Sequence, residues 1–106
     1  MNKGAMAGLL LKAQKMQEAI QKAQDNLVNI QVEGSAGGGM VKVVANAAQE
    51  VMAIKIDPEV IDPQDHEMLE DLVMAAVNQA MVAAKQRAQE EMSQITGGMM
   101  PKIPGL

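Results

Sequence analysis

The fold of this chain is decided by one stretch of sequence, VEGSAGGGMVKV, which occupies residues 32–43. Three consecutive glycines at 37–39 lead directly into a valine-rich run at 40–44, and β-branched residues favour a strand. A phosphate-binding loop would instead end in Gly-Lys-Ser/Thr and open a helix. The glycines therefore predict a tight connection between two strands, with backbone φ angles in the positive region that glycine adopts readily.

A long helix is expected before this stretch, from about residue 6 to about residue 29. Its apolar residues recur at alternating intervals of four and three, and this heptad seam comprises Leu9, Ala13, Met16, Ile20, Ala23, Leu27 and Ile30. At 1.5 Å per residue the helix would be ~36 Å long, which exceeds what a short sheet covers. The seam predicts packing on another long helix, in the same chain or in a second copy. The alternative is an ordinary amphipathic helix packed on its own sheet.

Three short strands are expected in the middle of the chain, at 30–34, 40–45 and 51–56. Asn46 opens the turn between the second and third strands and is suited to the left-handed region. In the third strand, alternation predicts that Met52, Ile54 and Ile56 share one face. Asp57-Pro58 is expected to end that strand.

A second long helix has clear start signals. Asp62 is placed to cap it, Pro63 would take the first helical position, and the helix runs to about Gln94 before Gly97-Gly98. The sequence thus predicts an α+β fold in a single domain, 1–96: a long N-terminal helix, a three-stranded antiparallel sheet and a long C-terminal helix. Residues 97–106, rich in Gly, Met and Pro, are expected to form a flexible tail.

Composition limits both the core and the chemistry. The 106 residues include no Phe, Tyr or Trp, no Cys and 11 Met. Without aromatic side chains a monomeric core would be thin, and association is the natural remedy. The absence of Cys excludes disulfides and Cys-ligated metals. No apolar run approaches the ~20 residues of a membrane span, so neither a membrane segment nor a signal peptide is expected.

Charge is unevenly distributed along the chain, whose net charge is −4. Residues 1–24 carry four lysines against one glutamate, residues 25–71 carry ten acids against two lysines, and residues 72–106 carry three bases against two acids. DNA-binding domains are usually strongly basic. Any contact with nucleic acid would therefore depend on local basic stripes.

One such stripe is expected on the first helix. Lys15 and Lys22 are seven residues apart and project on the same side, with Lys12 on the adjacent flank, and all three avoid the heptad seam. A row of this kind suits phosphates. The alternative is that these lysines only solvate the outer face of the helix.

Catalytic and metal-binding patterns are weak. His66 is the single histidine, and with Asp62 and Glu70 at intervals of four it would share one helical face. One histidine with two carboxylates is poor ligand chemistry for zinc, and acids at a helix start also suit the helix dipole. Nothing in the sequence forms a credible catalytic constellation, so no enzyme activity, cofactor or small-molecule substrate is expected.

Several sequence blocks, in order and over nearly the whole chain, resemble the YbaB/EbfC family of bacterial nucleoid-associated proteins. They are KAQKMQE at 12–18, VEG at 32–34, GGGMVKV at 37–43, IDP at 56–58, EMLEDL at 67–72, AVN at 76–78 and TGGM at 96–99. The resemblance implies a tweezer-like homodimer with a central sheet and projecting helices. It also implies a non-enzymatic protein of the cytoplasm and nucleoid that binds double-stranded DNA with little sequence specificity, affecting nucleoid organisation and gene expression.

The resemblance places DNA binding on the projecting helices, where the candidate residues in this chain are Lys12, Lys15, Lys22, Lys85 and Arg87. The alternative hypothesis is an adaptor that binds other proteins through Met-rich and Ala-rich helical surfaces and does not bind DNA. The acidic net charge favours this alternative, because it opposes the approach of DNA.

Overall fold

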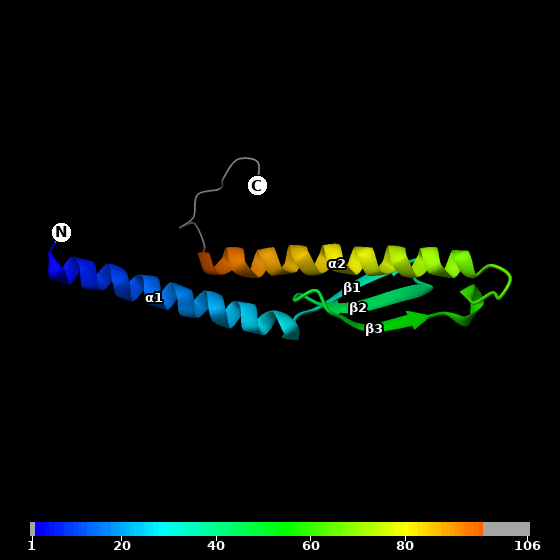
Figure 1. Cartoon of the computed structure of the whole chain (residues 1–106), viewed down its shortest axis with the longest axis horizontal. Helices are drawn as coiled ribbons and strands as arrows, with labels where there is room; N and C mark the ends of the chain where they lie inside the picture. Colours follow the sequence, from blue (N-terminus) through cyan, green and yellow to red (C-terminus); the bar gives the residue numbers. More distant parts are fainter. Residues whose placement is uncertain (1, 97–106) are drawn as a thin grey trace, which may run out of the picture.

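The computed structural model describes residues 2–96 and shows an elongated α+β chain (Figure 1). Its elements are α1 (Lys3–Asn26), η1 (Leu27–Asn29), β1 (Gln31–Ala36), β2 (Val41–Asn46), β3 (Val51–Ile56), η2 (Pro58–Val60) and α2 (His66–Thr96). The strands form one antiparallel sheet in the order β1-β2-β3. The predicted fold class is confirmed, and the expected tail at 97–106 lies outside the described residues.

Helix α1 begins earlier than the sequence pattern predicts. The Asn2 side chain accepts a hydrogen bond from the Ala5 amide at 2.7 Å, which caps the helix and allows it to begin at Lys3. Its end is also earlier, because the last turn tightens into the 3-10 segment η1.

Helix α2 begins later than predicted, and the assignment of Asp62 as its cap is wrong. Asp65 does the capping, since its side chain accepts a hydrogen bond from the Met68 amide at 3.2 Å. The Asp62 side chain instead accepts from the Gln64 amide at 2.9 Å and forms a turn ahead of the helix. Asp62 precedes α2, so it cannot share a helical face with His66 and Glu70 as the sequence spacing predicts.

The glycine run forms the turn between β1 and β2, as predicted. Gly37, Gly38 and Gly39 have φ angles of 64°, 67° and 93°. The Met40 amide closes the turn by donating to the Gly37 carbonyl at 3.3 Å. L residues rarely adopt these angles, so glycine is required here for conformational reasons.

The turn between β2 and β3 depends on Asn46, although in a different way from the prediction. Asn46 is buried in strand conformation, and its side-chain oxygen accepts hydrogen bonds from the amides of Ala48 and Glu50 at 3.0 and 3.1 Å. The left-handed residue is Gln49, with a φ of 65°. The Asn46 side chain thus takes the place of a backbone carbonyl as the acceptor for amides of the turn, which is a common role of Asn in tight connections.

The register of β2 and β3 corrects the expected face of the third strand. Val43 pairs with Ile54 and Val44 with Ala53, but Ala45 pairs with Val51, so the register shifts between Val44 and Ala45. The shift leaves Met52 as the extra residue, as in a β-bulge. The alternation therefore holds for Ile54 and Ile56 but does not extend to Met52.

Helix α2 packs over β1 and β2, and this contact forms the core (Figure 1). The buried apolar residues within 2–96 are small: Val41, Val43, Ala45, Ala47, Val60, Ala76, Ala80 and Ala84. The largest fully buried side chains are Val41 and Val43. The expectation of a thin core is confirmed, because each of these residues removes little apolar area from water.

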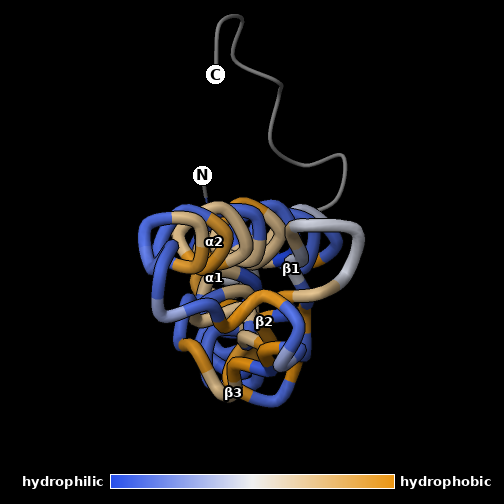
Figure 2. The backbone as a smooth tube through the Cα atoms, turned by 90° about the vertical axis from the view of Figure 1, so that its right-hand side faces the viewer, coloured by the Kyte–Doolittle hydropathy of each residue, from blue (hydrophilic) through white to orange (hydrophobic). Residues whose placement is uncertain are grey.

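Much apolar surface stays outside this core. Figure 2 shows β3 at the side of the sheet farthest from α2, and Val51, Met52 and Ile54 of β3 are all exposed. No residue of α1 is buried, although α1 lies beside the C-terminal half of α2 in Figure 1. The radius of gyration is 20.4 Å, against about 13 Å for a compact chain of this length.

Candidate nucleic-acid interface

Three of the predicted DNA-binding residues lie on α1. Lys12, Lys15 and Lys22, here called the α1 row, are all exposed. From Lys3 to Lys15 every residue is exposed, and Met16 is the first partly buried one. Part of the α1 row therefore stands on a helix segment without cover, where a long ligand such as a duplex has access.

The structure places an acid within the α1 row. Glu18 follows Lys15 by three residues and precedes Lys22 by four, and residues at these spacings are neighbours on a helix surface. Glu18 is exposed and forms no ion pair within 4.0 Å with either lysine. Its charge still reduces the positive potential of the row. Sequence reasoning missed this position, although the i+3 and i+4 spacing is visible in the sequence.

The two candidate cations of α2 differ in their environment. Lys85 follows the fully buried Ala84 and is exposed. The Arg87 guanidinium donates from Nε to Glu91 Oε1 at 3.1 Å, and the two side chains are 49% and 22% exposed. Lys85 and Arg87 are two residues apart, or ~200° around the helix, so one surface cannot include both. Lys85 is the more available cation, because Arg87 already has a carboxylate partner.

The described lysines have no carboxylate partners. Within residues 2–96 the pair Arg87–Glu91 accounts for the ion pairs at 4.0 Å or less. The candidate lysines of both helices therefore remain free to neutralise the charge of a ligand. Phosphate groups of a nucleic acid backbone fit this requirement, and their neutralisation releases counterions.

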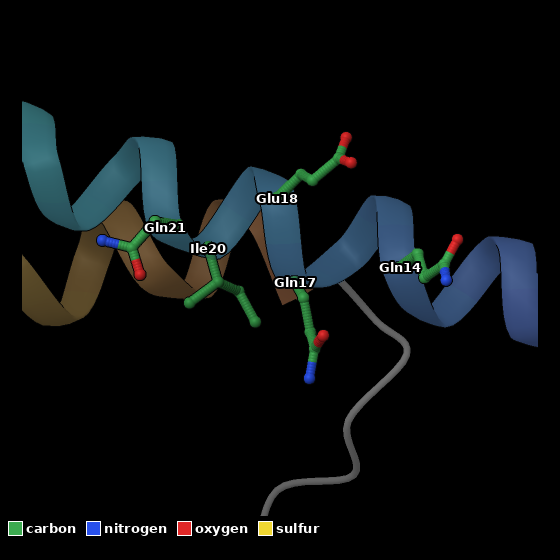
Figure 3. Close-up of a pocket in the computed structure, with 5 residues that line it drawn as sticks. All are labelled: Gln14, Gln17, Glu18, Ile20 and Gln21. Carbon is green, nitrogen blue, oxygen red and sulfur yellow. The ribbon is translucent and has the colours of Figure 1, made fainter.

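A shallow depression on α1 is a second candidate surface, but its side chains are not suited to catalysis or metal binding. Its lining residues are Gln14, Gln17, Glu18, Ile20 and Gln21 (Figure 3). Figure 3 shows Glu18 on the opposite side of the helix from Gln17 and Ile20. Three amides, one carboxylate and one isoleucine provide neither a nucleophile with a base nor a set of metal ligands.

Other kinds of site find no support in the part of the chain that is described. Across residues 2–96, no three His, Asp or Glu side chains come together in a group that could hold a metal ion. Within the same residues, neither long helix has a stretch apolar enough to cross a membrane.

Comparison with known proteins gives the class of this chain. Residues 2–99 match the YbaB/EbfC DNA-binding family. A nucleoid-associated protein of Caldanaerobacter subterraneus is 53% identical over 98 residues, which cover 92% of this chain and 86% of that protein. A nucleoid-associated protein of Bordetella avium is 50% identical over 106 residues, which cover 100% of this chain and 96% of that protein. The chain belongs to the YbaB/EbfC DNA-binding family, as its sequence blocks predict.

A solved structure agrees with the fold. The crystal structure of an uncharacterized protein from Helicobacter pylori superposes with a TM-score of 0.70 and covers 92% of this chain and 99% of that one. The two sequences are 23% identical, so the likeness supports the fold alone.

Proposed function

We propose that this protein binds double-stranded DNA in the bacterial nucleoid, as a homodimer, with little sequence specificity and without catalysis. The observation that carries the proposal is the α1 row, whose lysines are exposed and have no carboxylate partner among residues 2–96. Membership of a DNA-binding family over residues 2–99 supports the same function, and relatives are named nucleoid-associated proteins. Lys85 joins the α1 row as a phosphate contact, and Arg87 contributes less because Glu91 holds it.

Low sequence specificity follows from the side chains that are available. The chain has no aromatic residue to insert between bases. The proposed contacts are lysines, which are compact point charges suited to phosphates. Phosphate contacts position a protein on the duplex but carry no sequence information.

The homodimer in this proposal is supported by the exposed apolar surface. Met6, Leu9, Leu10 and Leu11 of α1 are all more than half exposed. The accessible surface is 7950 Å², against about 5700 Å² for a compact monomer of this mass. A second copy would cover these residues together with the face of β3 that carries Ile54, and would place two α1 rows on one particle.

A gel shift with duplex DNA at two salt concentrations tests the function. Binding driven by phosphates should be clear at ~50 mM salt and weaken by orders of magnitude at ~200 mM. The variant Lys15→Glu with Lys22→Glu reverses the α1 row and should abolish the shift while retaining helicity and dimer mass. The matched control Glu18→Gln removes the acid from the same row and should strengthen binding. If the parent shows no shift at either salt concentration, the chain is not a DNA-binding protein.

A further inference from the structure

The face of the sheet that points away from α2 carries two lysines directly opposite each other. Lys42 of β2 pairs with Lys55 of β3, and Ser35 of β1 pairs with Lys42 from the other side. Val41 and Val43 flank Lys42 and are fully buried in the core beneath α2, so Lys42 projects from the opposite face. Ser35, Lys42 and Lys55 are all exposed and are here called the sheet row.

The arrangement of the sheet row is unfavourable in the free protein. Like charges directly opposite each other on neighbouring strands destabilise a sheet. No carboxylate in residues 2–96 lies within 4.0 Å of either lysine to offset this repulsion. Glu33 shares the face but pairs with Val44, one row farther along the sheet. The repulsion is relieved when an anion lies across the two lysines.

One of these lysines lies close to the glycine turn. A Cβ on Gly39 would lie 3.6 Å from Cε of Lys42, so the aliphatic stem of Lys42 passes close to the turn. Neighbouring strands are ~4.8 Å apart, so the three positions of the sheet row span ~10 Å.

We propose that the sheet row contacts backbone phosphates of DNA and forms a second contact surface besides the α1 row. This inference rests on the proposed DNA binding and assigns it a further site. Lys42 and Lys55 neutralise phosphate charge, and the Ser35 hydroxyl donates a hydrogen bond to a phosphate oxygen. The contact is independent of base sequence, because it involves no base edge.

The test is the salt dependence of DNA affinity, measured by fluorescence anisotropy with a labelled duplex. The variant Lys42→Gln with Lys55→Gln should bind more weakly, and its slope of log K against log salt should be smaller by ~1.8 per chain in contact. Its melting temperature should equal or exceed that of the parent, because the opposed charges are gone. The control Lys42→Arg with Lys55→Arg keeps both charges and should keep the parent slope.

A third variant tests the sign of the effect. Glu33→Gln removes an acid from the same face of the sheet as the sheet row and should tighten binding. If the parent binds DNA and the glutamine pair binds with the same affinity and slope, the sheet row is overturned while the proposed function stands. Failure of the arginine pair to retain binding also counts against it. If the parent binds no DNA, both proposals are overturned.

Discussion

Gly34 of β1 and Ala80 of α2 meet backbone to backbone. A Cβ built on Gly34 would lie 2.9 Å from Cα of Ala80 and closer still to the Ala80 amide and the Ala76 carbonyl. Both alanines are fully buried. Since backbone atoms cannot rotate aside as a flexible side chain does, this contact fixes the distance between helix and sheet and keeps the core narrow.

Gly34→Ala should therefore destabilise the protein. Overpacking of a close contact costs about 1–3 kcal/mol, and here the neighbouring atoms belong to the backbone. Urea unfolding followed by circular dichroism measures the change. Gly8→Ala is the matched control, because a Cβ there meets nothing within 4 Å on the exposed helix α1. That control should gain about 0.5–1 kcal/mol, the usual difference between Gly and Ala within a helix. Equal stabilities for the two variants would contradict the close contact.

Gly38→Val should lower the melting temperature for a purely conformational reason. Gly38 has a φ of 67° and open space around its Cα, so a larger side chain meets strain but no clash. The left-handed region costs an L residue about 1–2 kcal/mol. Gly38→Asn should be milder, since Asn tolerates this region.

Calorimetry of the parent with ATP should show no heat of binding, because the glycines form a hairpin turn. Saturable micromolar binding would contradict this interpretation.

Asn46→Ala should destabilise the β2–β3 turn. The substitution removes the acceptor of the Ala48 and Glu50 amides, whose hydrogen bonds measure 3.0 and 3.1 Å. Each of these hydrogen bonds contributes about 0.5–1.5 kcal/mol, because Ala48 and Glu50 are exposed and water can replace the lost acceptor. Hydrogen exchange should report the loss first at residues 46–50. An unchanged exchange rate in that segment would show that the side chain is not needed.

Sedimentation at low micromolar concentration should give about twice the chain mass of 11.3 kDa. Ile54→Lys distinguishes a monomer from a dimer, because the Ile54 side chain is 45% exposed in the single chain and would be covered only by a second copy. A lysine there would be tolerated by a monomer but would bury a charge in a dimer, at several kcal/mol. The melting temperature of the parent should also rise with protein concentration. A folded monomer at micromolar concentration would contradict the dimer.

The sequence predicts the elements of this fold because their signals are local. The heptad spacing of α1, the valines of β2 and the boundary of β3 at Asp57-Pro58 each depend on neighbouring residues, and β3 spans Val51–Ile56 as expected. Local sequence signals could not decide whether Asp62 or Asp65 caps α2. Both residues have the right chemistry, and their hydrogen-bond geometry decides.

Long-range contacts explain what the sequence does not predict. The role of Gly34 depends on α2, whose contacting residues Ala76 and Ala80 lie more than forty positions away in the sequence. The opposition of Lys42 and Lys55 depends on strand register, which is set by the turn and by the shift at Val44. The positions of the α1 lysines could be predicted from the sequence, because helical periodicity alone places them on one side of the helix.

The central claim is that phosphate contacts by the α1 row bind DNA. Two chains offering Lys12, Lys15 and Lys22, with Lys85 in addition, neutralise about six to eight phosphates, which corresponds to a slope of log K against log salt of roughly −5 to −7. The sheet row would make the parent slope steeper still. The decisive measurement is this slope for the parent and for Lys15→Glu with Lys22→Glu. The account predicts a steep slope for the parent and no binding by the variant at ~0.15 M salt. A variant that binds as tightly as the parent, with the same slope, would contradict it.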